Sequence, residues 1–167
     1  IRGMTNKDVQ EALQQKFGEN IFNVEEPFGL LTISTHRENI IDLLTWLKEH
    51  DSLQFIFLTD ICGVHWPERQ MKFEVVYLLH SLAHNLRLRI KVALPNDHPN
   101  VHTASKIFPC ANWMERETYD FYGIHFDGHP NLKRILNVDE LSFFPMRKEI
   151  PLEDNTRTDK NDAMFGR

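Results

Sequence analysis

Two neighbouring stretches in which apolar and polar side chains alternate constrain the fold of this chain most. Every second residue is apolar between Met71 and His80, and between 86 and 92 Leu, Ile and Val alternate with Arg and Lys. A period of two gives a strand one buried and one solvated face, which is typical of antiparallel sheets. The stretch Leu53–Ile61, apolar on both faces, lies just before them, and the links 63–70 and 81–85 are short. The sequence therefore predicts an antiparallel meander of three strands.

Two helix-start signals precede the meander. In each, a threonine is followed three residues later by a carboxylate, as in a capping box, and apolar residues then recur at helical spacing. The two signals are Thr5 with Asp8 and Thr35 with Glu38. We expect one helix that ends near Gly18 and one over 36–50, with a short apolar strand at 28–33 between them. Adjacent strands with short links then predict an α+β fold, in which two N-terminal helices pack on a mixed sheet that contains the meander.

The chain divides into a globular part and a C-terminal extension. Two short helices are expected near 103–107 and 111–122, and Pro and Gly are too frequent after them for long elements. We therefore predict one α+β globular domain over 4–126, and an extended Pro-rich arm and tail over 127–167 that dock on partner proteins. Such a segment has little core of its own and would order mostly on binding, the alternative being a mobile chain end. Residues 1–3 are interpreted as an expression scar ahead of a native Met.

The composition argues against several classes of protein. A net charge of −5 is wrong for a nucleic-acid binder, because phosphate recognition needs clustered Lys and Arg. We find no run of about 18 apolar residues that could span a bilayer, and no apolar signal-peptide core. Cys62 and Cys110 lack metal-ligand spacing and are too few for a disulfide framework or for an iron–sulfur cluster with four cysteine ligands, which favours a reducing compartment. No Gly-x-Gly-x-x-Gly fingerprint for a dinucleotide follows a strand.

Residues 113–136 hold an unusual mixture of acidic, basic and aromatic side chains. Residues at helical spacing share one stripe of a helix, because about 3.6 residues make a turn. One such stripe consists of Cys110, Met114, Glu117 and Phe121. The other three members are apolar, so Glu117 would be a carboxylate on a packed face, where it must be paired or neutralised.

We interpret Glu117 as a buried structural anion that a cation of the downstream loop holds in place. Arg134 is the first candidate for this cation, and Arg147 is the second. Arg116 and Asp120 lie four residues apart, which is the spacing of an ion pair along a helix. The segment would then be a structural network of charges.

Two other interpretations of these acids stay open. Glu115, Glu117 and Asp120 could form a general acid/base set, which requires carboxylates that converge on a cleft. Glu115, Asp120 and His129 could hold a metal ion, and three histidine pairs have a gap that would suit zinc on a helix. The three pairs are His80/His84, His98/His102 and His125/His129. None lies in a convincing helix, so we favour the structural network, with His129 hydrogen-bonded to the loop ahead of Pro130.

The order of these residues resembles a family signature. Glu-Arg-Glu, two residues, Asp, two aromatics, six residues, His-Pro and then Lys-Arg-Ile-Leu is similar to the signature of the C-subunit family of NADH:quinone oxidoreductase. The stretch 145–151 is similar to the family's Pro-Leu-Arg-Lys-Asp-x-Pro ending, whereas 139–144 lacks the family's usual Trp and Gly. The positions that the resemblance marks as structural are Glu115, Arg116, Glu117, Asp120, Gly123, His129, Pro130, Lys133, Arg134, Pro145, Arg147, Lys148 and Pro151.

The resemblance implies an accessory subunit in the peripheral arm of a proton-translocating NADH:quinone oxidoreductase of the complex I type. Such a subunit supports electron transfer from NADH to quinone through flavin and iron–sulfur clusters that its partners hold. It implies no catalytic, cofactor-binding or metal-binding residue in this chain, and no activity of the isolated chain. The expected partners are the large quinone-site subunit and the small terminal-cluster subunit. The chain would lie peripherally, at the cytoplasmic face of the cell membrane, and be held there by the complex.

Three rival functions follow from the same residues. The first is the equivalent domain of an energy-converting membrane-bound hydrogenase, in which the same family occurs. The second is a small zinc-dependent hydrolase built on the histidine pairs, which stoichiometric zinc surviving dialysis would indicate. The third is a self-sufficient binding module, which would be a stable monomer without partners.

Overall fold

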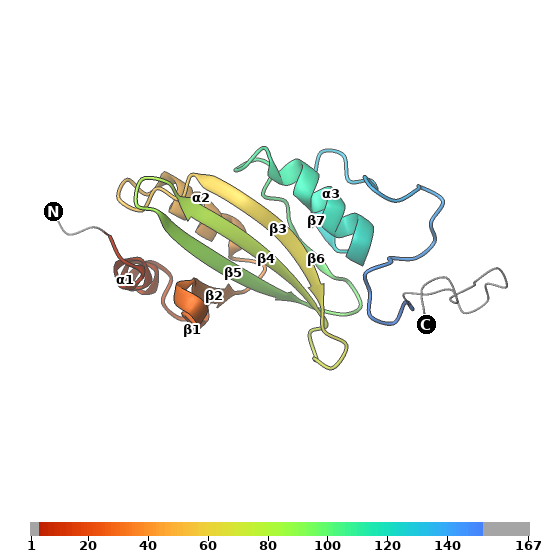
Figure 1. Ribbon diagram of the computed structural model, residues 1–167, viewed down its shortest axis with the longest axis horizontal. Helices are drawn as coiled ribbons and strands as arrows, with labels where there is room; N and C mark the ends of the chain where they lie inside the picture. Colours follow the sequence, from red (N-terminus) through yellow and green to blue (C-terminus); the bar gives the residue numbers. More distant parts are fainter. Residues whose placement is uncertain (1–3, 152–167) are drawn as a thin grey trace, which may run out of the picture.

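The computed structural model describes residues 4–151. Within that range the chain forms a five-stranded sheet, three α-helices and a small two-stranded sheet next to α3 (Figure 1). The helices are α1 (Asn6–Phe17), α2 (Ile40–Glu49) and α3 (Ala111–Tyr122), with 3₁₀ turns at Gly18–Asn20 and Pro27–Gly29. The strands are β1 (Ile21–Glu25), β2 (Leu31–Thr35), β3 (Phe57–His65), β4 (Phe73–Ser81), β5 (Leu86–Leu94), β6 (Asn100–His102) and β7 (His125–Asp127).

The large sheet is mixed and has the strand order β1-β2-β5-β4-β3. Strands β3, β4 and β5 form the predicted antiparallel meander, in which Val75 lies opposite Gly63 on one side and Val92 on the other. β2 pairs with β5 in parallel, with Leu31 beside Leu88. The α+β class with a mixed sheet is therefore confirmed, and β3 is left as an edge strand.

The core forms where the apolar face of the sheet meets the helices. Figure 1 shows α2 behind the meander and α1 at the β1–β2 end. Leu43, Leu44 and Leu47 of α2 are fully buried and share one core cluster with Val75 and Tyr77 of β4. Each such leucine contributes about 1.5–3 kcal/mol through burial, so the stripe on α2 is what fastens this helix to the sheet.

The third helix packs along the edge strand. α3 and β3 approach closely at Gly63, where a Cβ atom would lie 2.6 Å from the Tyr122 ring and 3.0 Å from Thr118. The Thr118 hydroxyl donates a hydrogen bond of 3.3 Å to the carbonyl oxygen of Ile61. A glycine in β3 therefore lets the helix lie directly against the sheet edge.

The first predicted helix is confirmed with its cap. The backbone N–H of Thr5 donates to the Asp8 carboxylate at 2.7 Å, and the Asp8 N–H donates back to the Thr5 hydroxyl at 3.4 Å. The helix ends at Phe17, and Gly18 follows it with a φ of 51°. The threonine and the acid three residues later were thus a correct start signal.

The second start signal is wrong. Thr35 is the last residue of β2, and its hydroxyl donates to the Asn20 carbonyl at 2.8 Å instead of capping a helix. α2 consequently begins at Ile40 and not at 36. The helix expected near 103–107 is a turn, because the segment is held from outside by bonds to α3 that are described below.

Predicted strands are displaced where buried apolar residues lie outside the sheet. The strand expected at 28–33 starts later, as β2, because Phe28 has a φ of 55° in a 3₁₀ turn and is exposed. The strand expected at 53–61 also starts later, as β3, because Leu53 and Phe55 are buried in the preceding loop. β1 was not predicted, since four of its five residues are exposed or half-buried and leave little apolar pattern.

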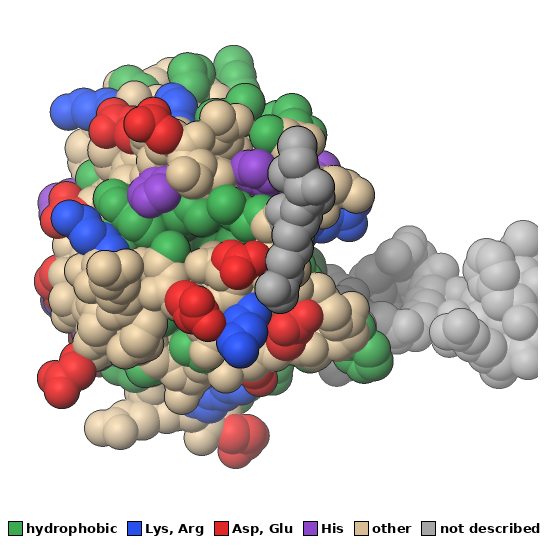
Figure 2. Space-filling view, turned by 90° about the vertical axis from the view of Figure 1, so that its left-hand side faces the viewer, with side chains coloured by type: hydrophobic (Ala, Val, Ile, Leu, Met, Phe, Trp, Pro, Cys, Tyr) green, Lys and Arg blue, Asp and Glu red, His purple; other side chains and the backbone are tan. Residues whose placement is uncertain are grey.

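The surface mixes charges of both signs. Figure 2 shows the end of the molecule that lies to the left in Figure 1, where acidic and basic side chains surround a band of hydrophobic ones. The outer face of β4 is less exposed to solvent than the alternation predicts, since Glu74 and Val76 are only 8% and 7% exposed. Among residues 4–151, none of the helices has both the length and the apolar character needed to cross a membrane.

Candidate functional site

α3 turns a different stripe toward the core from the one predicted. The buried residues of this helix are Ala111, Glu115, Arg116, Thr118 and Asp120. Glu117 is exposed, so the hypothesis that it is the buried structural anion is wrong. The helix is rotated by about 100°, the step of one residue, relative to that hypothesis. Both stripes contain apolar side chains, and spacing alone could not separate them.

The buried structural anion is Asp120, whose side chain is 0% exposed. Its Oδ2 atom accepts the backbone N–H groups of Ile135, Leu136 and Asn137 at 3.0, 2.8 and 2.9 Å. Its Oδ1 atom accepts from Arg134 Nη1 at 2.7 Å and from Asn137 Nδ2 at 3.1 Å. Burial raises the pKa of Asp120, but the donors, led by the Asn137 N–H and Arg134, outweigh burial and hold the pKa well below its usual range. The carboxylate is ionised and enclosed by its donors.

Arg134, predicted as the first candidate cation, does pair with a buried carboxylate of α3. Besides its bonds to the Asp120 side chain and carbonyl, it donates through Nη2 to the carbonyls of Leu141 and Phe143 at 2.7 and 2.8 Å. Its guanidinium also lies 5.0 Å from the centre of the Phe144 ring. One arginine therefore ties three points of the segment after β7 to α3.

Arg116 does not form the predicted pair with Asp120. Its Nε donates to the carbonyl of Lys133 at 3.1 Å, and its Nη2 donates to the carbonyl of Arg134 at 2.8 Å. The guanidinium lies 5.3 Å from the ring centre of Trp113. The downstream loop lies close to both Arg116 and Asp120. Its backbone carbonyls accept the hydrogen bonds of Arg116, which helical spacing had predicted would go to Asp120.

Glu115 is a second fully buried carboxyl group of α3. Its two oxygens accept from the Thr103 hydroxyl at 2.5 Å and from the Ala104 N–H at 2.6 Å. Burial is the larger influence and raises the pKa of Glu115 to about 7, although both hydrogen bonds lower it. These bonds also tether 103–104 to α3, directly before the turn at 105–107, which explains why no helix forms there. Sequence reasoning missed Thr103 and Ala104, because nothing in that stretch pointed to a carboxylate partner.

His129 was predicted to hydrogen-bond the loop ahead of Pro130, but it links the loop to α3 instead. Its Nε2 lies 3.0 Å from the Asn112 carbonyl oxygen, and its Nδ1 accepts the Asn131 N–H at 3.0 Å. These partners require the tautomer with the proton on Nε2. The ring is 3.9 Å from the Glu115 carboxylate and both side chains are fully buried, so the histidine encloses this acid without bonding to it.

Arg147 lies where α3 ends. Its Nε donates to the Tyr122 carbonyl at 2.8 Å, and its guanidinium sits 4.9 and 4.7 Å from the ring centres of Phe73 and Phe144. Gly123 ends the helix with a φ of 72°, and a Cβ there would lie 2.5 Å from Phe144 and 2.6 Å from Arg147. Only glycine combines this backbone conformation with room for both neighbours. Arg147 was also considered as a partner of Glu117; it makes no ion pair within residues 4–151.

A histidine of β3 receives the end of the same segment. The Lys148 N–H donates to Nδ1 of His65 at 3.0 Å, and the His65 side chain is 4% exposed. Burial lowers the pKa of His65, although Glu149 raises it. Nδ1 is thus an acceptor on a neutral ring, and the Glu149 carboxylate 3.3 Å away is an electrostatic neighbour and not a hydrogen-bond partner.

The remaining residues of the signature lie at the surface. Lys133 contributes its carbonyl to Arg116, and its side chain is exposed. Pro130 and Pro151 are exposed and Pro145 is half-buried. Among the described residues, nothing assigns these three prolines a specific contact.

The catalytic and metal-binding interpretations both required acidic side chains that converge on one site, and the described residues show no such convergence. Asp120 and Glu115 are each enclosed by their own donors, and Glu117 lies at the surface. Between residues 4 and 151, no group of three or more His, Cys, Asp and Glu could hold a metal ion. We call Glu115, Arg116, Asp120, His129 and Arg134, together with their bonded partners, the α3 network. What this arrangement can do chemically is to fix the path of residues 128–151 across α3.

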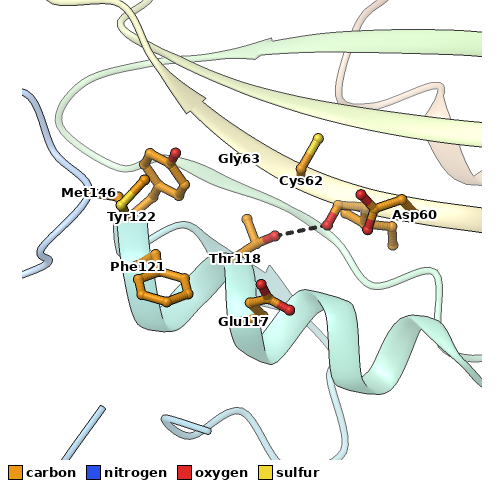
Figure 3. Close-up of a pocket in the computed structure, with 9 residues that line it drawn as sticks. Asp60, Cys62, Gly63, Glu117, Thr118, Phe121, Tyr122 and Met146 are labelled. Atoms are coloured by element: carbon orange, nitrogen blue, oxygen red, sulfur yellow. Dashed lines mark hydrogen bonds between the residues drawn. The ribbon is translucent and has the colours of Figure 1, made fainter. Parts of the chain in front are cut away.

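A pocket of about 220 Å³ opens between α3 and the edge strand β3 (Figure 3). Its lining comprises Asp60, Ile61, Cys62, Gly63, Glu117, Thr118, Phe121, Tyr122 and Met146. Sequence reasoning did not find this pocket, because strand alternation does not say which helix covers the edge of a sheet. The exposed Glu117 of the signature lies in its wall.

Comparisons with known proteins identify a family and several proteins to which the chain is similar. Residues 33–156 match the family described as respiratory-chain NADH dehydrogenase, 30 Kd subunit. The C subunit of the NADH-quinone oxidoreductase of Rhizobium johnstonii is 48% identical over 124 residues, which are 74% of this chain and 62% of that protein. The C subunit of the Bartonella henselae enzyme is 44% identical over 140 residues, 84% of this chain and 69% of that protein. This chain spans about three fifths of the length of the first of these curated relatives.

Solved structures agree with the fold. The trypsin-resistant fragment of Nqo5 matches with a TM-score of 0.66 and 30% identity, over 74% of this chain and 98% of that one. A chain of the membrane-bound sulfane sulfur reductase, an archaeal respiratory membrane complex, matches with a TM-score of 0.76 over 87% of this chain and 85% of that one. At 23% identity this second likeness concerns the fold alone.

Proposed function

The chain belongs to the respiratory-chain NADH dehydrogenase 30 kDa subunit family, and we propose that it acts as a cofactor-free accessory subunit of a proton-translocating NADH:quinone oxidoreductase. In this role it supports electron transfer from NADH to quinone without touching either molecule. Flavin and iron–sulfur clusters belong to partner subunits, chiefly the small terminal-cluster subunit. The chain lies peripherally, at the cytoplasmic face of the membrane, beside the large quinone-site subunit.

The single observation that carries this proposal is the internal pairing of the signature charges. Asp120 is enclosed by Arg134 and three backbone N–H groups, and Arg116 is taken up by two carbonyls. Catalytic acids and bases need access to a substrate proton, whereas these groups have no free position for one. Because these charged residues of the signature are satisfied by hydrogen bonds within the chain itself, they support a structural role.

The described part (127–151) of the segment predicted to dock on a partner over 127–152 presents apolar side chains to solvent. Leu136 and Val138 are 64% and 66% exposed, and Phe143 is 42% exposed. Trp113 of α3 adds a fourth such side chain at 57% exposure. Exposed apolar groups that gather on one segment are typical of interaction surfaces, and the α3 network gives this segment a fixed shape before it meets a partner. Residue 152 and the tail over 153–167 lie outside the described residues.

Co-purification of the full-length protein tests the proposed function. An affinity-tagged copy, expressed from its own locus, is expected to bring down an assembly that oxidises NADH with a quinone as acceptor. The same protein purified alone is expected to do neither half of this reaction. Turnover by the isolated chain would contradict the accessory role, and so would recovery of the tagged protein free of any NADH dehydrogenase subunit from detergent-solubilised membranes.

A further inference from the structure

The pocket between β3 and α3 offers backbone groups of an edge strand that no other strand in the described part of the chain takes up. In the β3–β4 ladder Cys62 faces Val76, and Trp66 bonds to Lys72 across the hairpin, so the backbone groups of residues 61 and 63 point away from β4. Thr118 satisfies the Ile61 carbonyl. By the same register the Gly63 carbonyl points away from β4, on the side where Gly63 lines the pocket, and no hydrogen bond to it is found outside the strand ladders of residues 4–151.

Two carboxylates stand on opposite sides of this opening. Figure 3 shows Glu117 on α3 and Asp60 on β3, both beside the pocket. Both are exposed, and neither forms an ion pair within the described part of the chain. Their negative field is felt at Cys62: burial raises the pKa of this thiol most, and Asp60, Glu74 and Glu117 raise it further.

The rest of the lining is apolar and aromatic. Phe121 and Tyr122 come from the last turn of α3, and Met146 closes the pocket from the C-terminal segment. Aromatic faces attract flat cations, and a guanidinium combines stacking with directed N–H donors. The pocket is therefore complementary to a guanidinium group, because it combines an acceptor carbonyl, two unpaired carboxylates and aromatic walls.

We propose that this pocket receives an arginine side chain of a neighbouring subunit, with its guanidinium between Glu117 and Asp60 and one N–H donated to the Gly63 carbonyl. This inference rests on the proposed function, because the neighbour is another subunit of the same complex. A whole added strand does not fit here, since α3 already lies within contact distance of the strand edge at Gly63. An ammonium group would satisfy the charge but would use the aromatic walls less well than a planar guanidinium does.

Titration of the isotopically labelled full chain with N-acetyl-arginine amide tests the pocket directly. At low ionic strength we expect saturable amide shifts at residues 60–63 and 117–122. Glu117→Gln is expected to weaken this binding at least threefold, and the double variant with Asp60→Asn to abolish it. Glu49→Gln, an exposed glutamate at the end of α2, is the matched control and should bind as the parent does. N-acetyl-citrulline amide, the neutral isostere, should not bind. Absence of saturable shifts at 60–63, or equal binding of the citrulline probe, would overturn the proposal.

Charge reversal in the assembled complex separates this inference from the proposed function. Glu117→Lys should lower the fraction of the chain retained by the complex after a moderate-salt wash at least tenfold, while Glu49→Lys leaves it unchanged. If both variants are retained equally, the arginine pocket is wrong although the subunit assignment stands. If the parent chain itself is not retained, the proposed function fails instead.

Discussion

The carboxylate of Asp120 accepts a hydrogen bond of 2.7 Å from Arg134, and the two side chains are 0% and 10% exposed. This pair joins the last turn of α3 to Arg134, which follows Asp120 by fourteen residues. Three consecutive backbone N–H groups complete the shell of the same carboxylate. Removal of either charge would therefore leave several buried donors or acceptors without a partner.

Substitution of this carboxylate should destabilise the protein strongly. Asp120→Asn leaves Arg134 without its counter-charge, and loss of one partner of a buried pair costs about 3–5 kcal/mol. Glu117→Gln, on the exposed side of the same helix, should change the free energy of unfolding by less than about 0.5 kcal/mol. Urea unfolding of the two variants beside the parent provides the measurement. A larger effect at Glu117 would restore the hypothesis that the structure rejects.

The pH dependence of stability should show a buried Glu115. Folding raises the pKa of this acid from about 4.3 to about 7. Between these values the folded chain binds a proton that the unfolded chain has lost, so the free energy of unfolding falls as the pH rises, by up to about 4 kcal/mol. Glu115→Gln should remove this decline. Unfolding curves at pH 4.5, 6 and 7.5 isolate the effect as the difference between variant and parent, and parallel profiles would refute it.

Asp120 contributes in the opposite sense. Its pKa is depressed by folding, so its stabilising effect is complete above the unfolded value of about 3.9 and is lost as the pH falls further. The parent protein should therefore lose stability below about pH 4, and Asp120→Asn should show a smaller loss over the same range. Acid titration of both proteins by circular dichroism is the test. An equal acid loss in the two would mean that other carboxylates dominate.

Gly123 should tolerate alanine far less well than a glycine of similar backbone conformation. Gly29 has a φ of 76° with no described atom within 4 Å of the position that a methyl group would take, whereas Gly123 has a φ of 72° with Phe144 and Arg147 in contact. Gly29→Ala should cost about 1–2 kcal/mol from the backbone alone. Gly123→Ala should cost at least about 1 kcal/mol more, because the methyl group displaces packed atoms. Equal costs in thermal or urea unfolding would show that the close approach carries no energy.

Arg116→Lys should not be a conservative change. A lysine cannot donate to two carbonyls in the geometry of the planar guanidinium, so about 1–3 kcal/mol should be lost. Arg87→Lys on the exposed end of β5 is the matched control and should be close to neutral. Hydrogen exchange adds a local readout, since amides of 133–137 should exchange faster in the Arg116 variant only. Unchanged protection there would count against the role of Arg116.

Sequence reasoning succeeded where one residue period was unambiguous. The alternation of β4 and β5 placed both strands, and the Thr5 capping box placed α1. It failed for β1, whose single buried residue Ile21 leaves no pattern, and at the start of β3, where Phe55 is buried in a loop. A run of apolar residues predicts that the residues are buried, but buried residues also occur in loops, so the run does not mark where a strand begins.

The site was predicted in kind but not in detail. A carboxylate of 113–136 held by Arg134 was expected and exists, yet the carboxylate is Asp120 and not Glu117. Two stripes one residue apart both carry apolar side chains, so the packed face depends on where β3 and Gly63 meet the helix. Contacts between segments far apart in sequence, such as Thr103 with Glu115, leave no local signal.

A double-mutant cycle on Asp120 and Arg134 tests most directly whether the signature charges serve the fold. The free energies of unfolding are compared for the parent, Asp120→Asn, Arg134→Gln and the double variant. Mutual satisfaction predicts that the double variant is more stable than the sum of the single losses implies, with a coupling of about 1–3 kcal/mol. If the losses in free energy of unfolding of the two single variants add up to that of the double variant within about 0.5 kcal/mol, the account is contradicted. The two side chains would then not stabilise the fold through their interaction with each other.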